Sequence, residues 1–185
     1  GRPMSYHMEY GYSCMGYEIA GALGIKMAQP ERDVVCMIGD GSYMMANSEL
    51  ATAAMMGVKI TLVVTDNRGF GCINRLQMST GGAEFNNLLD HTQYANPSRI
   101  DFAAHAAAMG AETRKVSKIS ELEAGLREAR RATGPFVLVI DTDPYPITQA
   151  GGTWWDVAVP AVSTREAVRE ARQNYLKNLK RQRAN

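Results

Sequence analysis

Residues 34–42 read VVCMIGDGS, an apolar run that ends in a Gly-Asp-Gly tripeptide centred on Asp40. A second apolar run, residues 58–64, ends shortly before Asn67, which follows Asp40 by 27 positions. Both runs are rich in β-branched residues and are bounded by Gly, Asp and Asn, so each is predicted to be a short buried strand. Residues 48–57 lie between them and predict one helix. Such a crossover makes the two strands parallel.

The residues that follow these two strands carry oxygen ligands. Because the carboxyl ends of parallel strands meet at one edge, Asp40 and Asn67 are expected to lie together where open α/β sheets bind ligands. Carboxylate, amide and carbonyl oxygens suit Mg²⁺ or Ca²⁺ better than zinc, and Mg²⁺ often takes some of its ligands from a phosphate. Gly39 and Gly41 allow close backbone approach, and the Gly41 and Ser42 amides can point at phosphate oxygens. We therefore expect a site for a metal-bridged diphosphate.

This arrangement resembles the diphosphate motif of thiamine diphosphate (ThDP) enzymes, in which Gly-Asp-Gly is followed by an Asn after the next strand. The resemblance implies ThDP and Mg²⁺ as cofactors, with Asp40, the Asn67 side chain and the Gly69 carbonyl as metal ligands. The family often has Asn-Asn where this chain has Asp66-Asn67. The ligand is the second of the pair, so the site is retained. Without the resemblance, the same residues would be a strand-end Asp in a turn and an Asn at the start of a loop.

A second segment, residues 10–17, reads YGYSCMGY and precedes a helix-like run over residues 18–28. In ThDP enzymes of the acetolactate synthase and pyruvate decarboxylase group, a similar Gly-x-Met-Gly stretch lies under the aminopyrimidine ring. The resemblance implies that Met15 wedges the cofactor into its bent form. It also implies that the Ser13 carbonyl and the Met15 amide hydrogen-bond the pyrimidine. The alternative is a Met that only fills the core.

Three stretches are more specific to one branch of the family than the cofactor motifs are: residues 6–13, 69–77 and 152–157. They resemble a branch of the acetolactate synthase-like ThDP family that opens a cyclic polyol dione with water in inositol catabolism, giving 5-deoxy-glucuronate. The likeness runs over nearly the whole chain and corresponds to the C-terminal ThDP-binding domain of the family. Two alternatives stay open. One is an acetolactate synthase-like carboligase or 2-oxoacid decarboxylase, and the other is a non-catalytic interaction module with the ThDP fold.

The resemblance also implies a partner domain. In the family, the Glu that activates the pyrimidine comes from a separate N-terminal pyrimidine-binding domain, usually of a second subunit. No candidate for that domain is found in these 185 residues. We therefore expect such a domain in the same or a second subunit, a homodimer or homotetramer at full length, and no turnover by this chain alone. The chain begins with Gly1 rather than Met, as a piece of a longer polypeptide would.

Composition agrees with a globular domain in a reducing cytoplasm. The chain is 45% hydrophobic and 21% charged, and its net charge of +1 gives no reason to expect nucleic acid or an anionic membrane as partner. No apolar run of about 18 residues predicts a membrane span. Cys14, Cys36 and Cys72 are odd in number and widely spaced, which argues against a disulfide framework or a zinc site.

The rest of the pattern alternates between helices and strands. The expected elements are a helix over 101–109, a strand over 111–116, a helix over 120–133 and a strand over 136–141. The expected fold class is α/β, a doubly wound parallel sheet flanked by helices, over residues 1–150. Residues 151–185 are expected to form an irregular segment and a helix that docks on this domain. Capping boxes predict helix starts at Ser120 and Ser163, and residues 66–97 are expected to form a long loop.

No residue is assigned as the acid–base catalyst. His7 and His91 lie in loop-like regions near the two cofactor segments and are candidates for proton transfer, although most polar loop residues have no catalytic role. His105 lies in an Ala-rich helix and is expected to be structural. Polar residues of the long loop, such as Asn74, Arg75 and Gln77, are candidates for binding substrate hydroxyls.

Overall fold

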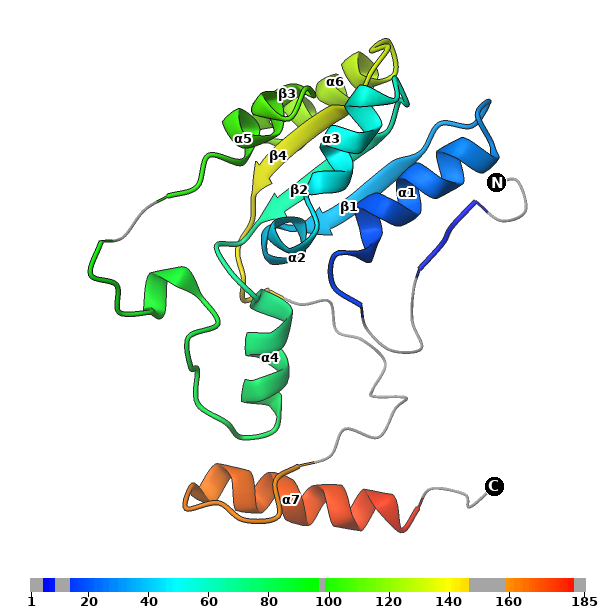
Figure 1. Cartoon of the computed structure of the whole chain (residues 1–185). Helices are drawn as coiled ribbons and strands as arrows, with labels where there is room; N and C mark the ends of the chain where they lie inside the picture. The colour runs from blue at the N-terminus through cyan, green and yellow to red at the C-terminus, as the bar shows by residue number, and fades with distance from the viewer. Residues whose placement is uncertain (1–4, 9–13, 97–98, 147–158, 182–185) are drawn as a thin grey trace. The chain divides into compact units, whose positions relative to one another are not determined.

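The computed structural model describes residues 5–8, 14–96, 99–146 and 159–181 (Figure 1). The chain divides into two compact units, one within residues 1–67 and 96–142 and the other within residues 68–95 and 143–185. The first unit contains a β-sheet with its helices, and the elements described in the second are helical. No helix in the described residues is long and apolar enough to cross a membrane.

The first unit is built on a four-stranded sheet in which all neighbouring strands are parallel (Figure 1). The strand order is β1 (Val35–Gly39), β2 (Thr61–Asp66), β4 (Phe136–Asp141) and β3 (Glu112–Val116). The connecting helices are α2 (Asp40–Met45), α3 (Ser48–Met55), α5 (Phe102–Ala108) and α6 (Ile119–Ala129). The predicted class, a parallel α/β sheet flanked by helices, is confirmed.

Alternating strand residues build a core on each face of this sheet. On one face, α1 (Tyr17–Ala28), α3 and α5 pack against β1, β2 and β4 in a cluster that includes Ile19 and Leu50. On the other face, α6 packs against β3 and β4, where Leu138 is fully buried. A Cβ at Gly125 of α6 would meet the Leu138 side chain, so the helix lies very close to the strand.

Strand position explains strand composition. β2 and β4 are central, and the first four residues of each are buried, which suits their Val- and Leu-rich sequences. β3 lies at one edge and carries charges. Arg114 pairs with Glu128 of α6 at 2.7 Å, and Lys115 pairs with Asp141 of β4 at 3.1 Å. Charged side chains on an edge strand disfavour pairing with a foreign strand.

The other edge strand, β1, is amphipathic. Cys36 and Ile38 are buried against the first core, whereas Val35 and Met37 are 54% and 71% exposed. The described residues therefore leave one face of β1 uncovered.

Most predicted elements of the first unit are confirmed to within about a turn, and β4 matches its predicted range. The start of β2 differs, because the apolar run from Val58 was expected to be strand throughout. The Val58 amide instead donates to Ala53 at 2.9 Å and closes the turn after α3, and pairing with β1 begins at Thr61.

The prediction of a loop over residues 66–97 was wrong in part. The segment contains α4 (Gly71–Ser79) and the short 3₁₀ turn η1 (Leu89–His91). The helix was missed because the α4 residues that become buried are Gly71 and Asn74, so no apolar stripe marks the sequence.

The capping boxes were also wrong in register. Helix α6 begins at Ile119, and Glu121 accepts a hydrogen bond from the Ser117 amide at 2.8 Å. The last helix, α7 (Glu166–Leu179), has Arg165 as its N-cap, and the Ser163 hydroxyl accepts from the Arg165 amide. Residues 147–158 lie outside the described residues, so the domain boundary at residue 150 stays a prediction.

Candidate functional site

Asp40 and Asn67 lie together at the carboxyl edge of the sheet. Asp40 follows β1 directly, Asn67 follows β2 directly, and the Asn67 backbone amide donates to Asp40 Oδ1 at 3.3 Å. Asp40 is only 3% exposed, so its carboxylate is held inside the protein. The structure thus brings together two of the three predicted metal ligands, although their role as ligands stays a prediction.

The third predicted ligand, Gly69, belongs to the second unit. It forms an isolated antiparallel bridge with Leu88, and its φ is +146°. A Cβ at this position would collide with the Asn87 carbonyl oxygen, so only glycine fits. Its carbonyl as a metal ligand also stays a prediction.

The donor set around Asp40 fits Mg²⁺. The described residues contain no group of three or more His, Cys, Asp or Glu side chains that could hold a metal. A metal at Asp40 would therefore draw on amide, carbonyl and phosphate oxygens, the hard ligands that Mg²⁺ prefers. Gly39 adds room, since a Cβ there would meet no atom within 4 Å. The Gly41 and Ser42 amides, the predicted phosphate donors, lie in the first turn of α2.

A hydrogen-bonded network joins the two predicted cofactor segments. The Gly16 amide donates to Ser42 Oγ at 2.8 Å and to Glu18 Oε2 at 2.9 Å. The Ser42 hydroxyl in turn donates to the Glu18 carboxylate at 2.8 Å. Glu18 is not among the site residues predicted from the sequence. The available signal was an acidic residue in the first turn of α1, where amides need acceptors.

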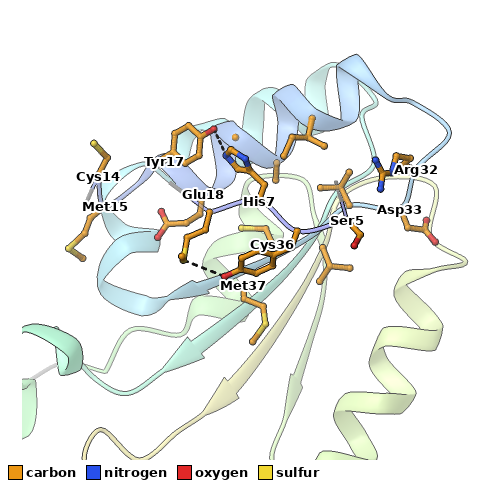
Figure 2. Close-up of a pocket in the computed structure, with 17 residues that line it drawn as sticks. Ser5, His7, Cys14, Met15, Tyr17, Glu18, Arg32, Asp33, Cys36 and Met37 are labelled. Carbon is orange, nitrogen blue, oxygen red and sulfur yellow. Dashed lines mark hydrogen bonds between the residues drawn. The ribbon is translucent and has the colours of Figure 1, made fainter. Parts of the chain in front are cut away.

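Met15, the predicted wedge, is 37% exposed and lines a pocket of about 610 Å³. The pocket lies between residues 5–8, α1 and β1. Figure 2 shows Met15 at one end of it and Arg32 at the other. The lining is mostly apolar, with His7 and Glu18 among its polar side chains. Ser13, the predicted partner of the pyrimidine, lies outside the described residues, so the structure does not test it.

Each of the three histidines lies within hydrogen-bond distance of a tyrosine hydroxyl. His7 Nε2 lies 2.9 Å from the Tyr17 hydroxyl, which Figure 2 marks. His105 Nδ1 lies 3.0 Å from the Tyr43 hydroxyl, and the two rings meet edge to face. Tyr43 is fully buried, and burial raises its pKa to about 12, so it stays neutral. His105 thus packs in the core region, as expected for a structural residue.

His91 has a carboxylate partner. Its Nδ1 lies 2.7 Å from Glu84 Oε2, while Glu84 Oε1 accepts from Asn74 Nδ2 at 2.8 Å. The Tyr145 hydroxyl lies 3.2 Å from His91 Nδ1. Sequence reasoning named His91 but missed Glu84 and Tyr145. His91 and Tyr145 are 54 positions apart, so no local spacing could have joined them.

Hydrogen bonds and burial shift the pKa values of three side chains, Glu84, Tyr145 and Cys36. The hydrogen bonds from Asn74 and His91 hold the pKa of Glu84 below its ordinary value, so this side chain is a carboxylate. The pKa of Tyr145 is raised by loss of solvent and by its hydrogen bond to Glu84. Elsewhere, burial and the nearby charge of Glu18 raise the pKa of Cys36 to about 12, so Cys36 is a neutral thiol.

The polar residues of α4 bond within their own unit. Arg75 Nη1 donates to the Pro144 carbonyl at 2.6 Å, and Gln77 Oε1 accepts from Asn87 at 2.6 Å. Asn74 is 1% exposed. These contacts give each side chain a structural partner, and their predicted binding of substrate hydroxyls stays a prediction.

Comparison with known proteins agrees with the cofactor that the sequence motifs predict. Residues 1–140 match the family described as "Thiamine pyrophosphate enzyme, C-terminal TPP binding domain". The chain is 43% identical over 189 aligned residues to 3D-(3,5/4)-trihydroxycyclohexane-1,2-dione hydrolase 2 of Bacillus cereus, covering 99% of this chain and 29% of that protein. It is 44% identical to 3D-(3,5/4)-trihydroxycyclohexane-1,2-dione hydrolase of Geobacillus thermodenitrificans, covering 95% and 28%. The chain therefore spans under a third of the length of these relatives.

A solved structure shares the fold. The ThDP-dependent 4-hydroxybenzoylformate decarboxylase of Rhodococcus jostii superposes with a TM-score of 0.62 and 22% identity, over 70% of this chain and 23% of that one. At this identity the likeness concerns the fold alone. The family match covers most of the chain, and the chain belongs to the thiamine pyrophosphate enzymes, as their C-terminal TPP-binding domain.

Proposed function

We propose that this chain is the ThDP- and Mg²⁺-binding domain of an enzyme that opens the ring of a trihydroxycyclohexane-1,2-dione by hydrolysis, giving 5-deoxy-glucuronate in inositol catabolism. The observation that carries the proposal is the 43% identity to a hydrolase of that name over 99% of this chain. Identity at that level extends well beyond the residues that a shared cofactor would require. The proposal concerns the whole enzyme, of which this chain is the cofactor-binding part.

The metal would be held by Asp40, the Asn67 side chain and the Gly69 carbonyl. The buried Asp40 carboxylate supplies the negative charge. The backbone amide of Asn67 donates a hydrogen bond to that carboxylate and orients it. The diphosphate would lie against the backbone of Gly39 and Gly41 and the Ser42 amide, at the start of α2.

The aminopyrimidine would contact Ser13 and Met15. The Gly16–Ser42–Glu18 hydrogen bonds support this arrangement, because they fix the Met15 segment against the start of α2. When bound, ThDP supplies the electron sink that carbon–carbon bond cleavage requires.

The partner would be the N-terminal pyrimidine-binding domain of the same or a second subunit, within a homodimer or homotetramer. Nine of the ten methionines that the structure describes are exposed, including Met37 of β1 and Met55 of α3 at 71% and 82%. Exposed apolar side chains in such number favour a partner surface. Because an essential Glu would come from that domain, we expect no turnover by the 185-residue chain alone. A cytoplasmic location is part of the proposal, supported by three free cysteines.

Calorimetric titration of ThDP with Mg²⁺ into the full-length protein tests the cofactor residues. We expect tight binding to the wild type and loss of most of it in Asp40→Asn, because the amide keeps the shape of the side chain but removes the charge that binds the metal. Asp66→Asn is the matched control, since the neighbouring carboxylate is not a proposed ligand, and its affinity should be retained. Equal affinity of wild type and Asp40→Asn would show that Asp40 is not a ligand.

The substrate is tested separately by supplying the full-length holoenzyme with the cyclic dione or with pyruvate. Consumption of the dione with formation of a carboxylate product supports the hydrolase. Consumption of pyruvate with release of CO₂, and none of the dione, would assign the protein to the carboligase or decarboxylase class. Binding of ThDP without turnover of either would favour a non-catalytic module.

A further inference from the structure

Glu84 is the centre of a hydrogen-bonded cluster in the second unit. Its Oε1 accepts from Asn74 Nδ2 at 2.8 Å, and its Oε2 lies 2.7 Å from His91 Nδ1. The Tyr145 hydroxyl bonds to both the carboxylate and the imidazole. Asn74 is 1% exposed, and its Oδ1 has no hydrogen-bond partner among the described residues. A buried, fixed amide thus anchors a carboxylate that orients a histidine.

The contact with Glu84 determines which nitrogen of His91 carries the proton. An ionised carboxylate can only accept, so a hydrogen bond at 2.7 Å requires the proton on Nδ1. In the neutral ring the lone pair then lies on Nε2. The described contact of Nε2 is the Tyr145 hydroxyl at 3.5 Å, at the outer limit of a hydrogen bond. The His91 side chain is 48% exposed, so water can reach the ring.

Backbone hydrogen bonds tie this histidine to the loop of Gly69, the proposed metal ligand. Gly69 bridges to Leu88, and the Leu89 amide donates to the Arg68 carbonyl at 2.8 Å. The His91 amide donates to the Leu88 carbonyl at 3.1 Å. All of these contacts lie within the second unit. They place His91 three residues after Leu88, the residue that pairs with Gly69. The proposal that Gly69 binds the metal therefore makes His91 a candidate for chemistry at that site.

Of the acidic side chains near His91, Glu84 is the one that bonds to the imidazole. Asp90 is engaged by Arg68 in an ion pair at 2.6 Å. Asp143 lies near Tyr145, whose pKa is raised, so the tyrosine remains a neutral hydroxyl. The lowered pKa of Glu84 keeps it ionised, and the imidazole stays oriented.

We propose that His91, positioned by Glu84, transfers protons between water and substrate in the ring-opening reaction; this rests on the proposed function. His91 Nε2 takes a proton from water while the water oxygen bonds to a substrate carbonyl carbon, whose π electrons move onto the carbonyl oxygen. When that C=O re-forms, the electrons of the carbon–carbon bond pass to the carbon that departs. The imidazolium gives its proton to that carbon, so one water is added across the broken bond. Glu84 remains ionised and acts only by positioning the ring.

The test compares variants of the full-length holoenzyme on the cyclic dione. We expect His91→Ala to lower kcat by about 100-fold or more, the range of general acid–base catalysis, with little change in ThDP affinity. Added imidazole should restore part of the rate to His91→Ala. Glu84→Gln should give an intermediate kcat and an altered pH profile, because the carboxamide can donate to the ring as well as accept. His105→Gln is the matched control and should keep the wild-type kcat, since His105 bonds only to Tyr43 among the described contacts.

A second readout needs no substrate. Nitrogen-15 NMR of histidine-labelled full-length protein, with His91 assigned through the His91→Gln variant, should show the proton on Nδ1 in the neutral ring. A proton on Nε2, or a kcat unchanged in His91→Ala, overturns the proposal. If the wild type does not consume the dione, the proposed function is wrong. The tautomer of His91 and the kcat of the same variants on pyruvate then decide the role of His91.

Discussion

At the scale of single residues, Glu84 makes the stability of the His91 cluster depend on pH. The hydrogen bonds from Asn74 and His91 favour the ionised carboxylate, so the folded-state pKa lies below the ordinary value of 4.5. A group with a lowered folded pKa stabilises the native state fully above its unfolded pKa. That contribution is lost as the pH falls from there through the folded value.

We therefore expect local opening around His91 to become easier as the pH falls below 4.5 in the wild type. Hydrogen exchange over residues 84–91, corrected for the intrinsic effect of pH, measures this. Glu84→Gln removes the titrating group, so its opening should change less over the same interval. The same pH dependence in both proteins would mean that another group is responsible.

The meeting of Asp40 and Asn67 was predictable because each directly follows a strand. Asp40 and Asn67 lie at the ends of apolar runs, and parallel pairing brings strand ends together without further information. Glu84 and Tyr145 have no such signal, since neither directly follows a strand and they lie 7 and 54 positions from His91. Glu18 lies between these cases: its position in the first turn of α1 was visible, but its bond to Ser42, 24 positions away, was not.

At the scale of elements, strands were predicted better than helix starts, for a physical reason. A buried central strand such as β4 needs consecutive β-branched and aliphatic residues, and these are visible in the sequence. Helix α4 buries Gly71 and Asn74 instead, and its place depends on the pairing of Gly69 with Leu88. The predicted caps were displaced because the acceptor side chains bond to other amides than the capping-box pattern assigns. Glu121 accepts from the Ser117 amide, three residues before Ser120, and Ser163 accepts from the Arg165 amide, one residue before Glu166.

The start of α7 depends on one glycine in the same unit. Gly81 has a φ of +84°, and a Cβ there would collide with the Ala167 carbonyl group in the first turn of α7. The Arg165 side chain also donates to the Gly81 carbonyl at 3.2 Å. We expect Gly81→Ala to destabilise this contact by about 1–3 kcal/mol, the usual cost of a strained backbone position.

Hydrogen exchange of α7 in the full-length protein would measure that loss as faster exchange over residues 166–179. Gly24→Ala in α1 is the control, because a Cβ there meets no atom within 4 Å and alanine favours a helix. Exchange in α7 that Gly81→Ala leaves unchanged would show that the helix does not depend on this close contact.

At the scale of the whole molecule, the sheet is covered unevenly. Among the described residues, one face carries α1, α3 and α5, whereas the other carries α6, which packs over β3 and β4. Val35 and Met37 of β1 are left exposed on a strand whose other face belongs to the main core. Apolar side chains in such positions usually lie at an interface. The relatives are more than three times as long as this chain, so their additional residues are numerous enough to cover this face of β1.

This leads to a prediction for methionine oxidation in the full-length protein. Met37 and Met55 are highly exposed in this domain, and Met109 packs against the core. If the pyrimidine-binding domain or a second subunit covers the first two, dilute peroxide should oxidise all three slowly, because a buried thioether is shielded from the oxidant. Peptide mass spectrometry would follow each site, and the same protein in denaturant gives the unprotected rate. Oxidation of Met37 and Met55 at that unprotected rate in the native protein, with Met109 still protected, would mean that these surfaces stay open to solvent and that the partner binds elsewhere.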